Sequence, residues 1–224
     1  MSMSRLGLLC LTGVWLATTI DQAYACGQGK LLLEDKFAKP SPVWGLRVDD
    51  KIDKFGPSGY QVTLTGDQQR DLLNQSGYFD NYEVCLTVSA PPQCSKTDTC
   101  EAKPLVGLTF WGVDTSSKYS LDISPTFATY SISREQNNKW LRPIPWTNLP
   151  DDAMKPQFKG PIELSVQVKG SSLVASINGV KVTDFDGMPP NGGSLVGFSI
   201  WTSESDTSPS TFNVTDFQVR ELPQ

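Results

Sequence analysis

The stretch that decides the fold runs from Ile162 to Val182 and reads IELSVQVKGSSLVASINGVKV. Apolar and polar residues alternate from Ile162 to Val168, which is the period of a strand with one buried and one exposed face. Asn178-Gly179 then separates two further apolar runs. This dipeptide strongly favours a two-residue hairpin, because a type I′ turn needs a positive φ at both central residues. The stretch therefore predicts consecutive antiparallel strands.

The same alternation continues through most of the chain after residue 30. It appears at 82–88, 106–111, 196–201 and 212–219, with turn-forming residues between the runs. No long segment has the 3.6-residue period of a helix, and no linker or internal repeat divides the chain. Roughly a dozen short strands in one unit predict an all-β fold, a two-sheet antiparallel sandwich.

Composition excludes several classes of protein. The chain has 224 residues, of which 38% are hydrophobic and 10% aromatic, so it can bury a substantial core. It contains no histidine, which excludes a Ser-His-Asp triad, a Cys-His dyad and an HExxH zinc site. The net charge of −5 argues against a nucleic-acid partner, which would require a basic surface.

The first 25 residues have the pattern of a secretory signal. Arg5 precedes an apolar stretch from Leu6 to Ile20, and Ala23-Tyr24-Ala25 provides small residues before a cut at Cys26. We therefore expect a secreted or periplasmic protein with a signal peptide at 1–25 and a single domain at 26–224. A membrane anchor is disfavoured, because the apolar stretch is shorter than a bilayer span, so no membrane insertion is expected. A lipoprotein with an acylated Cys26 is a further alternative, although an aliphatic residue is usual where Ala23 stands. The oligomeric state is unknown at this level.

Cleavage would remove Cys10 and leave an even set of cysteines, namely Cys26, Cys85, Cys94 and Cys100. In an exported chain this favours two disulfides, with three connectivities to choose from. We interpret residues 81–90 and 103–112 as a hairpin, which would place Cys94 opposite Cys100 across its loop. The predicted pairs are therefore Cys94–Cys100 and Cys26–Cys85. Zinc binding is the alternative, but no CxxC pair is present.

The order of several short motifs resembles a known superfamily. The motifs are Glu34-Asp35-Lys36-Phe37, Gly107–Trp111, Tyr119–Ile123, Tyr130–Arg134, Leu164–Gly170, Asn178–Val182, Gly192-Gly193 and Phe217–Val219. Together they resemble the concanavalin A-like lectin/glucanase superfamily, and within it the LamG-like and 3-keto-disaccharide hydrolase-like domains. The resemblance spans residues 31–221. It implies a jelly roll whose curved sheet often receives sugars on its concave face.

The glucanases of that superfamily carry a Glu-x-Asp-x-(x)-Glu strand motif that this chain lacks. Alternation along a strand would place such carboxylates on one face, where hydrolysis of a glycosidic bond needs a pair about 5 to 10 Å apart. Asp122 has no glutamate in register. A pair of Asp122 and Glu163 from separate strands is the alternative that would make the protein a glycoside hydrolase.

The aromatic pattern favours binding over catalysis. If Phe110 and Phe198 point into the core, alternation sends Trp111 and Trp201 to the outside, where indole rings can stack on sugars. Asp122, Glu163 and Arg134 would then hold hydroxyl or carboxyl groups. We therefore expect an exported carbohydrate-binding domain without catalysis. The alternative is a structural or protein-binding sandwich in which residues 135–160 form a loop that covers both tryptophans.

No cofactor or metal is expected. Calcium is the alternative, because it is common in LamG-like domains and aspartates 114, 184, 186 and 206 lie in turn-like positions. Their spacing matches no EF-hand loop, and turns favour aspartate without any metal.

Overall fold

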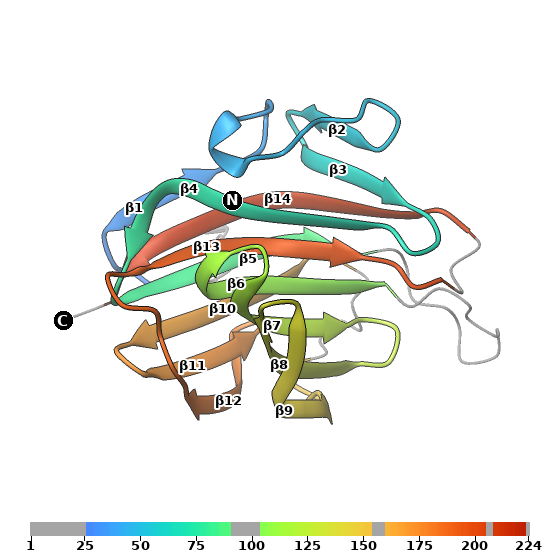
Figure 1. The fold of residues 1–224 in the computed structure, drawn as a ribbon. Helices are drawn as coiled ribbons and strands as arrows, with labels where there is room; N and C mark the ends of the chain where they lie inside the picture. The colour runs from blue at the N-terminus through green and yellow to red at the C-terminus, as the bar shows by residue number, and fades with distance from the viewer. Residues whose placement is uncertain (1–25, 91–103, 154–159, 205–207, 223–224) are drawn as a thin grey trace, which may run out of the picture.

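Two antiparallel sheets face each other across one core in the computed structural model (Figure 1), which describes residues 26–90, 104–153, 160–204 and 208–222. Sheet A has the order β12-β11-β10-β5-β14-β3-β2, with β1 also pairing with β14, and sheet B has the order β4-β13-β6-β7-β8-β9. The predicted all-β jelly-roll sandwich is confirmed. No helix in the described ranges has the length and apolar character needed to cross a membrane.

The bounds of the strands are as follows. Sheet A contains β1 (Leu31–Asp35), β2 (Asp53–Gly56), β3 (Gly59–Leu64), β5 (Tyr82–Ser89), β10 (Ile162–Lys169), β11 (Ser172–Ile177), β12 (Val180–Asp186) and β14 (Ser210–Glu221). Sheet B contains β4 (Gln69–Phe79), β6 (Leu105–Asp114), β7 (Ser117–Ser124), β8 (Thr129–Gln136), β9 (Lys139–Asn148) and β13 (Ser194–Trp201). One short 3-10 turn, η1, covers Pro42–Trp44.

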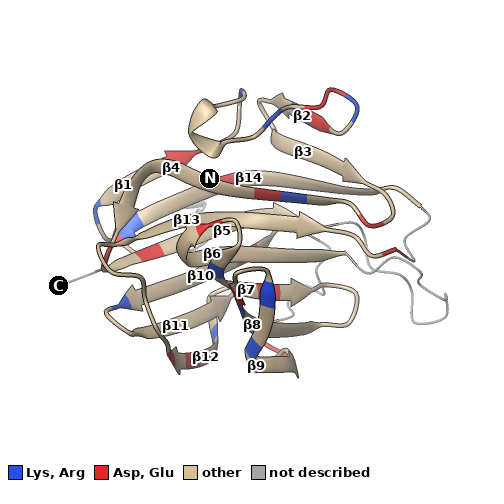
Figure 2. Cartoon of the chain, viewed as in Figure 1, with Lys and Arg blue, Asp and Glu red and all other residues tan. Residues whose placement is uncertain are grey.

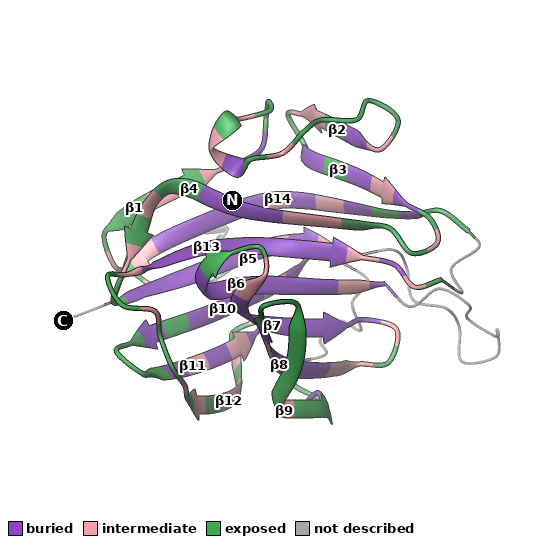
Figure 3. Cartoon of the chain, viewed as in Figure 1, coloured by how far each residue is buried: buried purple, intermediate pink, exposed green. Residues whose placement is uncertain are grey.

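The alternating residues bury one side of each sheet against the other. Buried positions dominate the central strands of both sheets (Figure 3), and aromatic rings fill the space between them. Trp44 packs edge-on against Phe217, with ring centroids 4.9 Å apart, and its indole nitrogen donates to Asp35 Oδ2 at 2.7 Å. Burial of apolar surface contributes about 25 cal/mol per Å² to the free energy of folding, and it is the main force that holds the two sheets together.

The hairpin predicted at Asn178-Gly179 is present. It joins β11 to β12, with Ile177 opposite Val180, and both turn residues have positive φ, 50° at Asn178 and 76° at Gly179. Positive φ at both positions is what a type I′ turn requires, and this requirement is the reason that Asn-Gly predicted a hairpin here.

The hairpin predicted for residues 81–90 and 103–112 is wrong. β5 lies in sheet A between β10 and β14, whereas β6 lies in sheet B between β13 and β7. An alternating strand can satisfy its apolar face from either layer of a sandwich, so sequence adjacency did not decide the pairing. The argument for Cys94–Cys100 therefore loses its basis. Both cysteines lie outside the described residues, and that pair remains a prediction.

The Cys26–Cys85 disulfide is present, with the two sulfurs 2.07 Å apart. It ties the segment before β1 to the middle of β5. Because the Cys26 sulfur is used in this bond, no thiol is free for acylation, which argues against the lipoprotein alternative. The predicted signal peptide lies outside the described residues.

Candidate functional site on the outer face of sheet B

Trp111 lies in the core, so its predicted outward orientation is wrong. The residue is 2% exposed, and its ring centroid lies 5.4 Å from that of Phe110 and 5.2 Å from that of Tyr119. The expected stack of Trp111 on a sugar therefore has no surface on which to form.

A bulge in β6 is the physical cause. On β13, Leu195 pairs with Gly112 and Gly197 pairs with Thr109, so two residues of β6, at 110 and 111, stand opposite Val196 alone. The extra residue reverses the alternation from that point onward. Position 111 also has a positive φ of 46°, which marks the local distortion.

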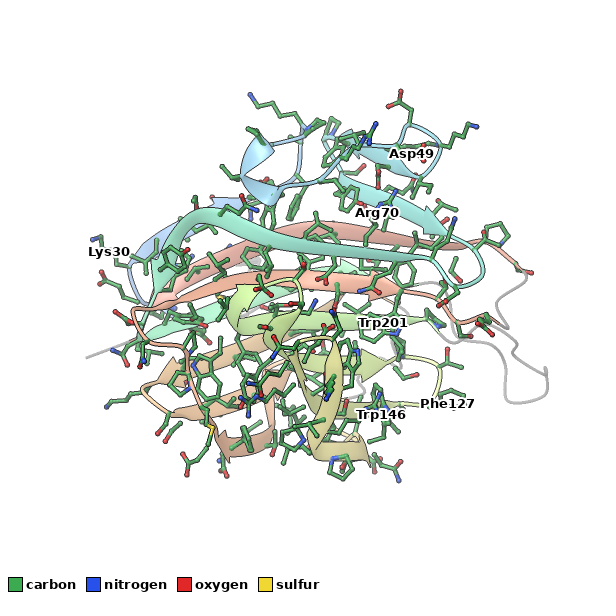
Figure 4. The ribbon with its side chains drawn as sticks, in the orientation of Figure 1. Lys30, Asp49, Arg70, Phe127, Trp146 and Trp201 are labelled. Atoms are coloured by element: carbon green, nitrogen blue, oxygen red, sulfur yellow. A yellow bond between two sulfur atoms is a disulfide. The ribbon has the colours of Figure 1, made fainter. Side chains whose placement is uncertain are left out.

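Trp201 keeps its predicted side. The alternation along β13 is unbroken from Val196 to Trp201, with Phe198 and Ile200 in the core. Trp201 lies on the outer face at the end of the strand, partly exposed (Figure 4).

Gly107 marks the point where Trp201 and Asp122 meet. A Cβ atom built there would lie 2.6 Å from Ser199 Oγ, 2.7 Å from Asp122 Oδ1 and 3.4 Å from Trp201 Cζ3. The three side chains come from β13 and β7, which flank β6 in the sheet. Glycine is therefore required at 107 for them to converge, and the structure brings together two of the predicted site residues.

Asp122 is a buried carboxyl group with one oxygen unused. Ser133 Oγ donates to its Oδ2, and the hydroxyls of Ser120 and Ser133 are 2.9 Å apart. Its Oδ1 has no hydrogen-bond partner among the described residues. Burial raises the pKa of Asp122 to about 6, although hydrogen bonds from Ser133 and Ser120 and the positive charges of Arg142 and Lys118 oppose the shift.

A buried ion cluster crosses the same face. Lys118 of β7 forms an ion pair with Asp71 of β4, and its Nζ lies 3.6 Å from Glu135 Oε2 of β8. Figure 2 marks the positively and negatively charged residues of both sheets. β6 and β13 separate β7 from β4, so in a flat sheet this ion pair would have to span about 14 Å between strands. Sheet B must therefore curve toward its outer face. We call this concave face, from β4 to β9, the trough, and its central side chains Lys118, Asp122 and Thr109 are buried.

Edge strand β9 forms one wall of this trough. For this segment the alternative expectation was a loop over residues 135–160 that covers both tryptophans. Trp140 pairs with Glu135 and so shares the face of the ion cluster. The Arg142 guanidinium lies 5.8 Å from the ring centroid of Trp146, and both tryptophans are exposed. Figure 4 places Trp146 and Trp201 at the same end of the sheet.

Arg134 and Glu163 lie away from this site. Arg134 pairs with Tyr119 across β7 and β8, and its guanidinium is 5.2 Å from the Tyr119 ring centroid, on the side of the strand opposite to Asp122. Glu163 belongs to β10 of sheet A, where its Oε1 accepts from the Cys26 backbone nitrogen at 3.2 Å. Asp122 and Glu163 point away from the core on different sheets, so the predicted carboxylate pair does not form.

The floor of the trough holds polar atoms that have no hydrogen-bond partner among the described residues. Five of these atoms lie on this face, from β4 to β8: Asp71 Oδ1, Thr109 Oγ1, Asp122 Oδ1, Ser124 Oγ and Ser131 Oγ. Native structures leave few such atoms unsatisfied. Because these atoms are buried, ordered water rather than a ligand at the surface would satisfy them.

Sequence reasoning missed two groups of this trough. Arg142 and Lys118 were not selected, because their role depends on β9 and β4 standing on either side of the face. The proline pair at 143 and 145 was the available signal that this segment is an edge strand.

No acidic cluster suited to calcium forms among the described residues. The single group of neighbouring metal-ligand atoms in those ranges is Cys26, Glu83 and Cys85, and its two sulfurs are bonded to each other. Asp114, Asp184 and Asp186 are exposed and do not converge, and residue 206 lies outside the described ranges.

No family model and no curated protein matches the chain. Solved structures do resemble it. The laminarinase catalytic domain from Thermotoga maritima has a TM-score of 0.60 at 8% identity, over 88% of this chain and 99% of that one. The carbohydrate-binding module CBM66 from Bacillus subtilis has a TM-score of 0.55 at 13% identity, over 75% and 91%.

A third solved structure, the Crh5 transglycosylase, has a TM-score of 0.55 at 9% identity, over 89% of this chain and 88% of that one. At these identities the likeness establishes the fold alone, and no match supports the LamG-like or 3-keto-disaccharide hydrolase-like assignment. The chain has the concanavalin A-like jelly-roll fold that carbohydrate-binding modules and glucanases share.

Proposed function

We propose that this protein is an exported carbohydrate-binding domain that holds its ligand in the trough of sheet B. The observation that carries the proposal is the set of solvent-accessible indole rings at the two sides of a polar floor, with Trp201 on β13 and the tryptophans of β9 opposite. Sugars present apolar C–H faces and a rim of hydroxyls, which such a surface complements.

Each side of the trough has a separate role. Trp201 and Trp146 stack on sugar rings, and Arg142 donates to ring or hydroxyl oxygens. Four strand spacings separate β13 from β9, about 19 Å along the sheet, so the trough suits an oligosaccharide segment better than a single ring.

Two further observations support an exported sugar-binding role. The Cys26–Cys85 disulfide suits an oxidising compartment. The similar structures are a carbohydrate-binding module, a laminarinase and a transglycosylase, which makes glycans the first ligands to test.

The carboxylates of the trough favour binding without hydrolysis. Asp71 and Glu135 are both engaged by Lys118. A glycosidase uses two carboxyl groups, one as acid and one as base or nucleophile, whereas these two are held by the same lysine.

The test is a titration of the purified protein with laminarin oligosaccharides and with plant, algal and bacterial polysaccharides, followed by calorimetry and tryptophan fluorescence. We expect Trp201→Ala to lower affinity at least tenfold, the equivalent of about 1.4 kcal/mol. Arg142→Ala should weaken binding, whereas Arg134→Ala should not. Tyr78→Ala, which removes an exposed ring elsewhere, is the matched control. No response to any glycan would leave a structural or protein-binding sandwich.

A glycoside hydrolase is the second candidate, and the raised pKa of Asp122 favours it. A carboxyl group with a pKa near 6 can serve as a general acid at neutral pH. Release of reducing ends from a polysaccharide, abolished in Asp122→Asn and retained in Glu163→Gln, would support this candidate over binding alone. Absence of turnover on every glycan that binds would exclude it.

A further inference from the structure

The outer face of sheet A holds the beginning of the described chain between two carboxylates. Cys26 is bonded to Cys85 of β5. Glu83 lies two residues before Cys85 on the same face. Glu163 of β10 stands opposite Thr87, two residues after Cys85. The disulfide therefore anchors Cys26 between a carboxylate on either side.

Backbone nitrogens of the anchored segment already contact both carboxylates. The Cys26 nitrogen donates to Glu163 Oε1 at 3.2 Å, and the Gly27 nitrogen donates to Glu83 Oε2 at 2.7 Å. A Glu83 carboxylate oxygen and the sulfurs of Cys26 and Cys85 all lie within 4.8 Å of one another. The Cys26 nitrogen thus contacts Glu163, and the next backbone nitrogen along the chain contacts Glu83.

Glu83 is a buried acid that has no cationic partner among the described residues. It is 1% exposed, and its other donor is the neutral amide of Gln167 at 3.2 Å. Within the described ranges no lysine or arginine nitrogen lies within 4.0 Å of it. Arg220 of β14, which stands opposite Glu83, donates instead to Gly29 O and to Gln218. A carboxylate buried in this way is costly unless a positive charge is supplied.

We propose that Glu83 and Glu163 form a binding site for the α-ammonium group that appears at Cys26 when the Ala25–Cys26 peptide bond is hydrolysed. Water supplies hydroxide to the Ala25 carbonyl carbon and a proton to the Cys26 nitrogen, with a signal peptidase as the catalyst. The amine then takes a second proton from solvent. The neutral amide, which has one N–H donor, becomes a cation with three N–H donors. This cation lies beside Glu83, the buried acid that has no cationic partner among the described residues.

This site would couple processing to folding. The ion pair can form only after cleavage, because the ammonium group does not exist before it. The disulfide keeps the new terminus in place. The proposal rests on the predicted cleavage before Cys26 and is independent of carbohydrate binding.

The first test is mass spectrometry of the exported protein, which should find Cys26 at the amino terminus. The second is the pH dependence of α-amine acylation, with exposed lysines as internal references. An exposed α-amine has a pKa of about 7.7–8.0, and two carboxylates should raise this pKa by about one unit or more, which makes acylation at pH 8 about fivefold slower. Glu83→Gln and Glu163→Gln should each restore faster acylation. Glu221→Gln, which removes an exposed acid paired with Lys30, should not.

A third measurement covers the case in which a glutamine variant fails to fold. Acetylation of the α-amine in the folded wild-type protein removes the charge without a mutation, and it should lower Tm. The proposal is overturned by an amino terminus elsewhere, by an ordinary α-amine pKa that the glutamine variants leave unchanged, or by an unchanged Tm after acetylation.

Discussion

Replacement of Lys118 by methionine tests the ion cluster that underlies the trough. The lysine side chain is 2% exposed and serves Asp71 and Glu135, whose side chains are 16% and 10% exposed. Methionine keeps the length and the apolar stem and removes the charge. Two carboxylates then remain on the buried face without a cation.

The expected loss follows from that burial. Removal of one partner of a buried ion pair costs about 3–5 kcal/mol, because the remaining charge is left uncompensated. We expect about 3 kcal/mol, the lower end, since both carboxylates keep some contact with solvent. For a domain of this size, about 2–4 °C per kcal/mol converts this to a fall in Tm of about 6–12 °C.

Urea denaturation followed by circular dichroism at pH 7 measures the free energy of unfolding. Lys181→Met is the matched control, because its ion pair with Asp184 is exposed on both sides and should contribute about 0–1 kcal/mol. In the triple variant Lys118→Met, Asp71→Asn, Glu135→Gln, much of the lost stability should return, because no uncompensated charge remains. If Lys118→Met costs no more than Lys181→Met, the reasoning about the cluster is refuted.

Three further predictions concern stability. Trp111→Ala should cost about 3–5 kcal/mol in urea denaturation, as expected for truncation of a core aromatic residue, and a loss below 1 kcal/mol would contradict its burial. Because the folded state raises the pKa of Asp122 from 3.8 to about 6, its contribution to stability is present at pH 4 and is lost as the pH rises to 6. The wild-type free energy of unfolding should therefore fall by about 2 kcal/mol relative to Asp122→Asn between pH 4 and pH 6, and parallel pH profiles would contradict the shift. Removal of the Cys26–Cys85 disulfide, which spans 59 residues, by a double serine substitution should cost about 4 kcal/mol in the chain-entropy model, and an unchanged unfolding midpoint would contradict it.

Local signals in the sequence predicted local structure well. Alternation placed the strands, and the Asn178-Gly179 turn appears with the backbone angles that selected it. The Cys26–Cys85 bond was also predicted, although the hairpin used to argue for the other pair does not exist. That error arose because an alternating strand does not specify which of two sheets it joins.

The site could be predicted in part, for a related reason. The alternation of side chains along a strand correctly places Trp201 and Asp122 on one face, since β13 and β7 keep this alternation through those positions. The alternation gives the wrong side for Trp111, because one extra residue in β6 turns this side chain from the outer face into the core. A bulge of this kind depends on the partner strand, so no pattern within β6 alone could reveal it. The contribution of Arg142 was hidden in the same way, because it depends on β9 pairing along β8.

The bulge that removes Trp111 from the outer face also helps to make the trough. An extra residue on one strand bends and twists that strand locally, and β6 lies at the centre of sheet B. Lys118 then joins strands on either side of β6 through a buried ion pair, which holds the curved form. Gly107, with no side chain, leaves space at the floor for Ser199, Asp122 and Trp201 to meet. Because curvature and charge coincide on this one face, a substitution that flattens the sheet should abolish ligand binding even when it touches no residue that contacts the ligand.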